Sequence, residues 1–164
     1  MEPIIRVLVV DDSPAIQQIL VAMLQSEPGF QVVGQARDGE EAVRLAARLR
    51  PDVITMDIHM PRMNGLQATR KIMSTTPRPI VVVADGSPDE DLNAAAIAAG
   101  ALATVEKPAE NSHADYEAVR EQLVTTIRLM ADVPVVALWP DGRLPDRTPD
   151  TEPVVELIAI AAST

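Results

Sequence analysis

Short apolar runs alternate along this 164-residue chain with longer segments whose apolar residues recur at helical spacing. Strands that alternate with helices form parallel sheets covered by helices on both faces. The pattern therefore predicts an α/β fold with a doubly wound, five-stranded parallel sheet. The expected strands are Ile5–Val10, Gln31–Gln35, Val53–Met56, Ile80–Val83 and Ala103–Val105.

Turn and capping residues set the limits of the expected helices. Ser13 suits the N-cap of the first helix with Pro14 at its first position, and Pro28-Gly29 ends that helix. Gly100 is expected to end the fourth helix. The helices after the first are expected at Glu40–Leu49, Leu66–Met73, Asp89–Ala99 and Ala114–Met130.

The chain is long enough to bury one good core, so we expect one domain over residues 1–130 and an appendage. Five prolines and no sustained periodicity predict a Pro-rich linker over residues 131–153. Residues 154–164 turn apolar again and are interpreted as the truncated start of a second domain. Either this segment folds back onto the first domain, or the chain is the front part of a longer protein.

Composition excludes several classes of function. The net charge is −10 and Phe30, Tyr116 and Trp139 are the only aromatic residues, so nucleic acid is not an expected partner. Without cysteine there is no thiol nucleophile or thiolate metal site, which fits a cytoplasmic protein. No apolar run reaches membrane-spanning length, so no membrane association is expected.

Acidic residues follow two of the predicted strands. Asp11 and Asp12 come after the first strand, and Asp57 comes after the third. The carboxyl ends of parallel strands meet at one sheet edge, where open α/β sheets keep their chemistry. Like charges held close together raise one another's pKa, whereas a hard divalent cation with oxygen ligands stabilises the ionised cluster. The sequence therefore predicts a divalent metal site at this edge.

Together with Lys107-Pro108 after the fifth strand, these acids resemble the receiver domain of two-component response regulators. That resemblance implies a flavodoxin-like sheet with strand order 2-1-3-4-5. Within the family, the chain is most similar to the N-terminal receiver of the chemotaxis protein-glutamate methylesterase, and its tail resembles the opening strand of the esterase domain, with Ser163 at the nucleophile position. The segments that carry this likeness are Ile5–Pro14, Pro51–Val53, Met60–Gly65 and Glu156–Thr164.

The resemblance implies a role for each site residue. Asp57 would take a phosphoryl group from a sensor histidine kinase, and Lys107 would donate to the phosphoryl oxygens. Asp12, Asp57 and the His59 backbone carbonyl would hold Mg²⁺, with Asp11 supporting the ion directly or through water. The phosphorylated receiver would then regulate a tethered output domain, here a methylesterase represented only by its first residues.

Three positions depart from the family pattern. Ala84 stands where receivers usually have a Thr or Ser switch residue, and Thr104 stands where they usually have an aromatic one. We therefore expect phosphorylation to survive while switching is weakened, because a hydrogen bond to a charged acceptor is worth about 1.5–3 kcal/mol. Asp85 either places a carboxylate near the incoming phosphoryl group or points outward as a turn residue before Gly86.

Other interpretations stay open. Taken singly, Asp57 could cap a turn, Asp11 and Asp12 could be N-capping acids, and Lys107 could be a solvated loop lysine. The whole chain could be a pseudo-receiver that binds a partner through residues 89–99, Thr104 and the fifth helix.

Two enzyme activities are disfavoured. A haloacid-dehalogenase-like phosphatase needs a second acid two residues after the first, where His59 stands. Esterase activity is not expected, because the triad partners of Ser163 would lie downstream of the last residue and Ala161 replaces the family glycine. Beyond its own phosphorylation and dephosphorylation, we expect no separate activity of this chain.

Overall fold

Five parallel strands form the middle layer of the protein, whose computed structural model describes residues 3–86, 89–108 and 113–136. The strands lie in the order β2-β1-β3-β4-β5, and each neighbouring pair is parallel. The predicted fold class and strand order are confirmed. The strands are β1 (Ile5–Val10), β2 (Phe30–Ala36), β3 (Val53–Met56), β4 (Ile80–Ala84) and β5 (Ala103–Glu106).

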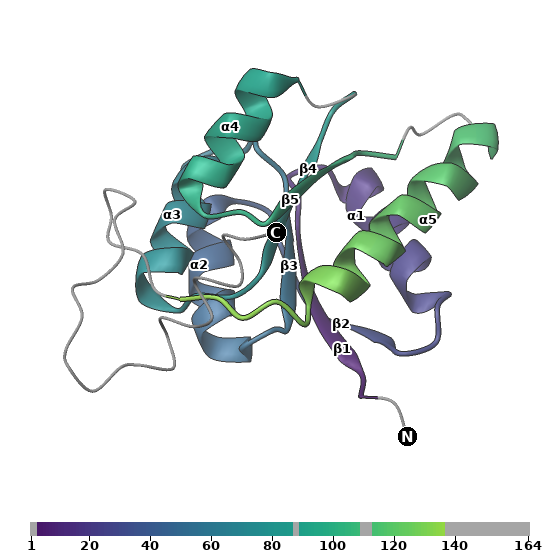
Figure 1. Cartoon of the computed structure of the whole chain (residues 1–164), viewed down its shortest axis with the longest axis horizontal. Coiled ribbons are helices and arrows are strands. Elements are labelled where there is room, and N and C mark those ends of the chain that lie inside the picture. Colours follow the sequence, from purple (N-terminus) through teal and green to yellow (C-terminus); the bar gives the residue numbers. More distant parts are fainter. Residues whose placement is uncertain (1–2, 87–88, 109–112, 137–164) are drawn as a thin grey trace.

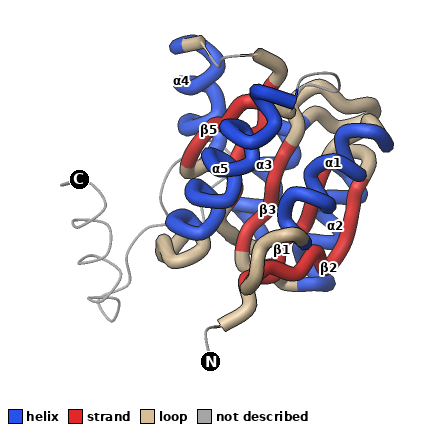
Figure 2. The backbone as a smooth tube through the Cα atoms, turned by 90° about the vertical axis from the view of Figure 1, so that its right-hand side faces the viewer, coloured by secondary structure: helices blue, strands red, loops and turns tan. Residues whose placement is uncertain are grey.

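Helices cover both faces of this sheet, with α1 and α5 on one side and α2, α3 and α4 on the other (Figures 1 and 2). Where definite limits were expected, for α2 to α5, the observed limits differ from them by at most two residues. Asp89, for example, is the N-cap of α4, where its side chain accepts a hydrogen bond from Leu92 N at 2.7 Å. The helices are α1 (Pro14–Gln25), α2 (Gly39–Leu49), α3 (Gly65–Thr75), α4 (Glu90–Ala99) and α5 (His113–Met130).

Two apolar layers hold the helices to the sheet. Successive strand side chains point to opposite faces, so Leu8 joins the layer under α2–α4 while Val7 and Val9 join the layer under α1 and α5. Because both faces of the sheet are covered, the central strands β3 and β4 are buried along their whole length and do not alternate between apolar and polar residues. Phe30 is the one aromatic side chain buried among the described residues, and the core consists mainly of aliphatic residues and methionine, among them Leu20, Met23, Leu24, Ile54, Ile72, Leu123 and Ile127.

Two capping residues named from the sequence mark a helix start and a helix end. Ser13 accepts a hydrogen bond from Ile16 N at 3.3 Å, and Pro14 follows it at the first helical position. Gly100 ends α4 with φ 115°, a left-handed conformation that favours glycine. The two helices lie on opposite faces of the sheet.

After α5 the chain crosses beneath the sheet toward α2 and α3 (Figure 1). Val135 packs against the apolar layer on the α2–α4 face, opposite α5. The remaining predicted linker, the segment 154–164 and Ser163 lie outside the described residues. Among the described helices, none is both long and apolar enough to cross a membrane.

Candidate functional site

Three carboxylates meet at the edge of the sheet where β1 and β3 end. One oxygen from each of Asp11, Asp12 and Asp57 lies within 4.8 Å of the others. Backbone hydrogen bonds continue the strand ladder into this edge, with Asp57 N donating to Val10 O at 2.9 Å and Asp11 N donating to Ala36 O at 3.0 Å. Asp11 and Asp57 are buried, whereas Asp12 is exposed. The predicted gathering of acids is therefore present.

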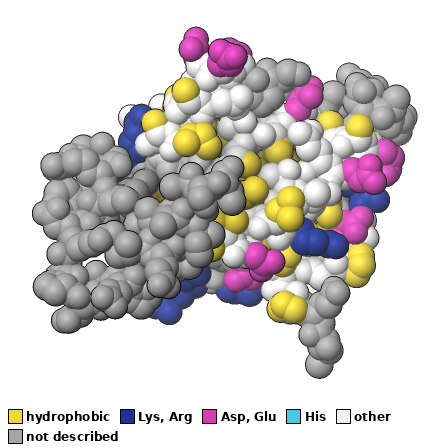
Figure 3. All heavy atoms as spheres, in the orientation of Figure 1, with side chains coloured by type: hydrophobic (Ala, Val, Ile, Leu, Met, Phe, Trp, Pro, Cys, Tyr) yellow, Lys and Arg dark blue, Asp and Glu magenta, His cyan; other side chains and the backbone are white. Residues whose placement is uncertain are grey.

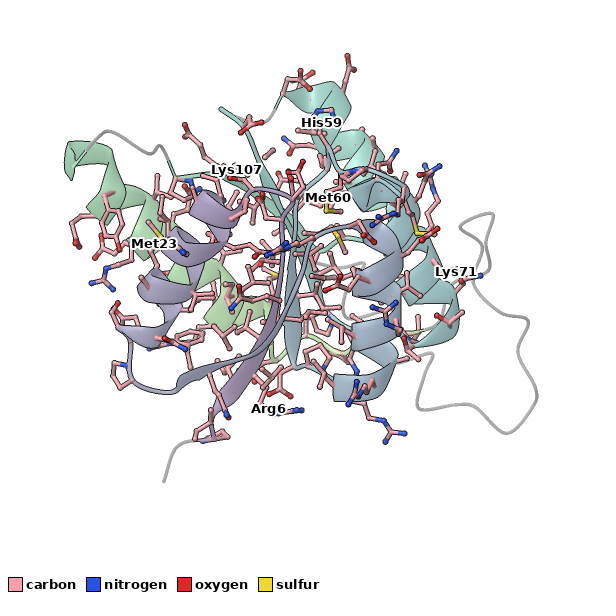
Figure 4. The ribbon with its side chains drawn as sticks, turned by 180° about the vertical axis from the view of Figure 1, so that it is seen from behind. Arg6, Met23, His59, Met60, Lys71 and Lys107 are labelled. Carbon is pink, nitrogen blue, oxygen red and sulfur yellow. The ribbon has the colours of Figure 1, made fainter. Side chains whose placement is uncertain are left out.

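Lys107 brings a positive charge to the same edge. Its Nζ lies 3.0 Å from Asp11 Oδ2 and 3.1 Å from Asp57 Oδ1, and only 9% of its side chain is exposed. Lys107 N donates to Ala84 O at 2.7 Å, so the lysine leaves β5 directly beside the end of β4. Figure 4 shows Lys107 and His59 at one edge of the protein, and Arg6 at the opposite edge. Lys107 is thus an ion-pair partner rather than a solvated loop residue.

Burial controls the ionisation of the acids. Desolvation, followed by repulsion from Asp11, raises the pKa of Asp57 to about 6 even though Lys107 opposes it. Desolvation also raises the pKa of Asp11, against a hydrogen bond from Ser13 N and the positive charge of Lys107. Desolvation lowers the pKa of Lys107, but its two acidic neighbours outweigh this effect and leave the pKa above its ordinary value. The charge of Lys107 is therefore not enough to offset the burial and mutual repulsion of Asp11 and Asp57.

This oxygen-rich cluster fits a hard divalent cation. Lys107 Nζ is close to Asp11 Oδ2, yet within the described residues that buried oxygen accepts no well-directed hydrogen bond. A divalent ion prefers such carboxylate ligands and reverses the cost of crowding them. His59 is exposed beside the cluster, and the ligand role of its backbone carbonyl stays a prediction.

The loop between β3 and α3 makes hydrogen bonds and a close backbone contact around Asp57. Ile58 N donates to Asp57 Oδ1 at 2.9 Å, and Gly65 N donates to Ile58 O at 2.8 Å. A Cβ atom on Gly65 would lie 1.9 Å from the Asp57 backbone oxygen, so only glycine fits this close approach. Asn64 and Gln67 complete a capping box at the start of α3. These contacts fix the direction in which Asp57 leaves β3.

Gln17 is a positioning residue that the sequence analysis missed. Its buried side chain donates from Nε2 to Asp11 O and to Ala36 O, each at 2.8 Å. This fork ties the ends of β1 and β2 together behind Asp11. The available signal was a polar residue on the inward stripe of α1, three and seven residues before Leu20 and Leu24.

The atypical positions also lie around this edge. Ala84 is buried at the end of β4, and Thr104 is half-buried in β5, where its hydroxyl donates to Asn93 Oδ1 of α4. Asp85 combines the two orientations considered for it, because 77% of its side chain is exposed while Oδ1 lies 3.8 Å from Lys107 Nζ.

A family model and curated relatives match this chain. The family described as response regulator receiver domain matches residues 7–120. A protein-glutamate methylesterase/protein-glutamine glutaminase 4 of Myxococcus xanthus is 46% identical over 98% of this chain and 48% of its own length. A corresponding enzyme of Hahella chejuensis is 50% identical over 79% of this chain and 38% of its own length. The chain thus spans about half the length, or less, of these relatives.

Solved structures agree with the sequence relatives. The response regulator domain of Thermotoga maritima CheB matches with a TM-score of 0.74 and 38% identity, covering 80% of this chain and 98% of that one. A chain from the CheX-CheY-BeF3-Mg²⁺ complex of Borrelia burgdorferi matches with a TM-score of 0.64 and 29% identity, covering 74% of this chain and 88% of that one.

Proposed function

Since this chain belongs to the response regulator receiver domain family, in its CheB-type branch, we propose that it accepts a phosphoryl group on Asp57 in a Mg²⁺-dependent reaction. The observation that carries the proposal is the contact of one buried lysine with two buried carboxylates, beside a third carboxylate that is exposed. The solved CheX-CheY complex that contains BeF3 and Mg²⁺ supports the same chemistry for a related chain.

The donor is a phosphohistidine of a sensor histidine kinase. An Asp57 carboxylate oxygen attacks phosphorus, the phosphorus–nitrogen bond breaks, and the departing imidazole nitrogen takes a proton, which leaves an acyl phosphate on Asp57. Bound Mg²⁺ would supply charge neutralisation for the transferring oxygens. Asp11, Asp12, Asp57 and the His59 carbonyl would hold it.

Lys107 has two functions in this proposal. Before transfer it offsets the charges of Asp11 and Asp57, from which it lies 3.0 and 3.1 Å away. After transfer its ammonium group donates to the new phosphoryl oxygens as a compact point charge. Gly65 and Ile58 keep Asp57 aligned through both stages.

The phosphorylated chain would act on a following output domain in the cytoplasm. The methylesterase relatives support a chemotaxis-type kinase and a tethered esterase, because this chain aligns with about half of such a protein. Ser163 would then stand at the nucleophile position of that esterase. A pseudo-receiver is the second candidate, favoured by Ala84, which lacks a hydroxyl, and by the Thr104 bond to Asn93.

Acetyl phosphate with Mg²⁺ tests the proposal. Intact mass should increase by about 80 Da, the mass of one phosphoryl group, and peptide mapping should place an acid-stable, base-labile adduct on Asp57. Asp57→Asn should abolish the adduct, whereas Asp91→Asn, which removes an exposed acid from α4, should not. No adduct on the parent chain would favour the pseudo-receiver.

A further inference from the structure

Lys107 contacts a third carboxylate that belongs to neither the buried pair nor the acidic cluster. Asp85 Oδ1 lies 3.8 Å from Lys107 Nζ, beyond its contacts with Asp11 and Asp57 at 3.0 and 3.1 Å. The side chain of Asp85 is 77% exposed, whereas that of Lys107 is 9% exposed. Asp85 therefore stands on the solvent side of the lysine, at the rim of the site.

The place of Asp85 in the chain fixes it there. It follows Ala84, the last residue of β4, whose carbonyl accepts the hydrogen bond from Lys107 N. Gly86 turns the chain next with φ 66°. The backbone thus places Asp85 next to Lys107, and the rotamer of its exposed side chain sets the distance between the two charges.

An incoming phosphoryl group must share this lysine. Donors of the group are anions, and the described residues offer them one cation paired with the site acids, Lys107. A fixed negative charge at the rim both competes for that ammonium and repels the donor. Repulsion of a monoanion or dianion at about 7 Å in water corresponds to roughly three- to tenfold in rate or affinity.

We propose that Asp85 is a specificity-determining residue that slows entry of anionic phosphoryl donors by competing for Lys107 and adding negative charge to the rim. This inference rests on the proposed phosphoryl transfer to Asp57. Its selectivity is one of charge: Asp85 disfavours acetyl phosphate, a dianion at neutral pH, more than phosphoramidate, a monoanion. It does not hold the metal, because its carboxylate lies outside the cluster of Asp11, Asp12 and Asp57.

Three variants separate charge from shape. Asp85→Asn removes the charge and keeps the shape, Asp85→Glu keeps the charge, and Asp91→Asn removes an exposed charge on α4 as the matched control. Adduct formation is followed by intact mass with both donors at low and high salt. Calorimetry gives the dissociation constants of Mg²⁺ alone and of beryllofluoride, a phosphoryl analogue, in the presence of Mg²⁺.

Asp85→Asn should form the acetyl phosphate adduct about three to ten times faster at low salt, with a smaller gain for phosphoramidate and for either donor at high salt. It should bind beryllofluoride more tightly and Mg²⁺ within twofold of the parent, while Asp85→Glu and Asp91→Asn should resemble the parent. Equal rates in the parent and Asp85→Asn would overturn this inference and leave the proposed function standing. Weaker Mg²⁺ binding by Asp85→Asn would also overturn it, by making Asp85 a metal ligand. Absence of adduct in every variant would overturn both.

Discussion

The Thr104 hydroxyl donates a hydrogen bond to Asn93 Oδ1, which joins β5 directly to α4. Mostly small apolar side chains pack this helix, because its buried residues are Ala96 and Ala99, Leu92 is partly buried against the apolar layer, and Ile97 is 55% exposed. Figure 3 shows apolar side chains on the face between α4 and α5, with acidic groups at the upper end of α4. Thr104 is one of the positions at which we expected this chain to depart from the family pattern.

Breaking this bond should loosen α4 more than the rest of the protein. A neutral hydrogen bond contributes about 1 kcal/mol, so Thr104→Val and Asn93→Ala should each speed amide hydrogen exchange in α4 by roughly fivefold. The Thr104→Val/Asn93→Ala double variant should cost less than the sum of the singles, since both remove one interaction. Additive costs would show that the two side chains act separately.

A hydroxyl at the end of β4 should strengthen the response to phosphorylation. Ala84→Thr places a donor beside Lys107, and in phosphorylated protein it should increase the phosphorylation-induced change in α4 hydrogen exchange. Ala84→Val, with the same shape but no hydroxyl, is the control for crowding at this buried position. If Ala84→Thr and the parent change equally, our account of the switch position is wrong.

Stability should depend on pH through Asp57. Its pKa is about 6 in the folded protein and ordinarily 3.8, so the folded state holds the proton more tightly and the free energy of unfolding falls as pH rises between these values. Asp57→Asn should therefore stabilise the metal-free protein at pH 7.5, by on the order of 1–3 kcal/mol. The gain should be much smaller at pH 4.

Urea denaturation in the presence of a chelator measures this effect at both pH values. Saturating Mg²⁺ should raise the stability of the parent at pH 7.5 and have little effect on Asp57→Asn, because the ion and the substitution relieve the same repulsion. An Asp57→Asn gain of equal size at pH 4 and pH 7.5 would contradict the raised pKa.

Substitution of Gly65 should damage both the fold and the site. Its added Cβ would meet the Asp57 backbone oxygen at 1.9 Å, and backbone cannot yield as a side chain can. Gly65→Ala should cost about 1–3 kcal/mol and weaken Mg²⁺ binding. Gly34→Ala is the control, since its Cβ would meet the flexible ends of Leu49 and Leu8. Unchanged Mg²⁺ affinity in Gly65→Ala would argue against its role in aligning Asp57.

Sequence patterns predicted the sheet and the acidic edge because both depend on local features. Continuous apolar runs mark strands buried on both faces, and parallel strands bring the residues that follow them to one edge. Asp11, Asp12 and Asp57 follow strand ends, so their convergence was predicted from topology, whereas Lys107 was added to the site by the family resemblance. Their chemical roles remain predictions.

Side-chain pairing between elements was not predictable in the same way. The bond from Thr104 to Asn93 depends on how α4 lies over β5, which no spacing along the chain encodes. The approach of Asp85 to Lys107 depends on the rotamer of an exposed side chain at a turn. The contacts of Gln17 could have been anticipated, because a polar amide within the apolar stripe of a helix needs a buried hydrogen-bond partner.

The crossing of the chain beneath the sheet places its exit far from the chemistry. Asp132 lines a surface pocket with Ile5 and Gly29, at the beginning of β1, whereas Asp57 follows the end of β3. A strand length of roughly 17–20 Å separates the end of the sheet where β1 begins from the end that carries Asp57. A domain that follows Val136 would thus begin at the end of the sheet remote from the acids, so any effect of Asp57 on it has to be transmitted through the receiver itself.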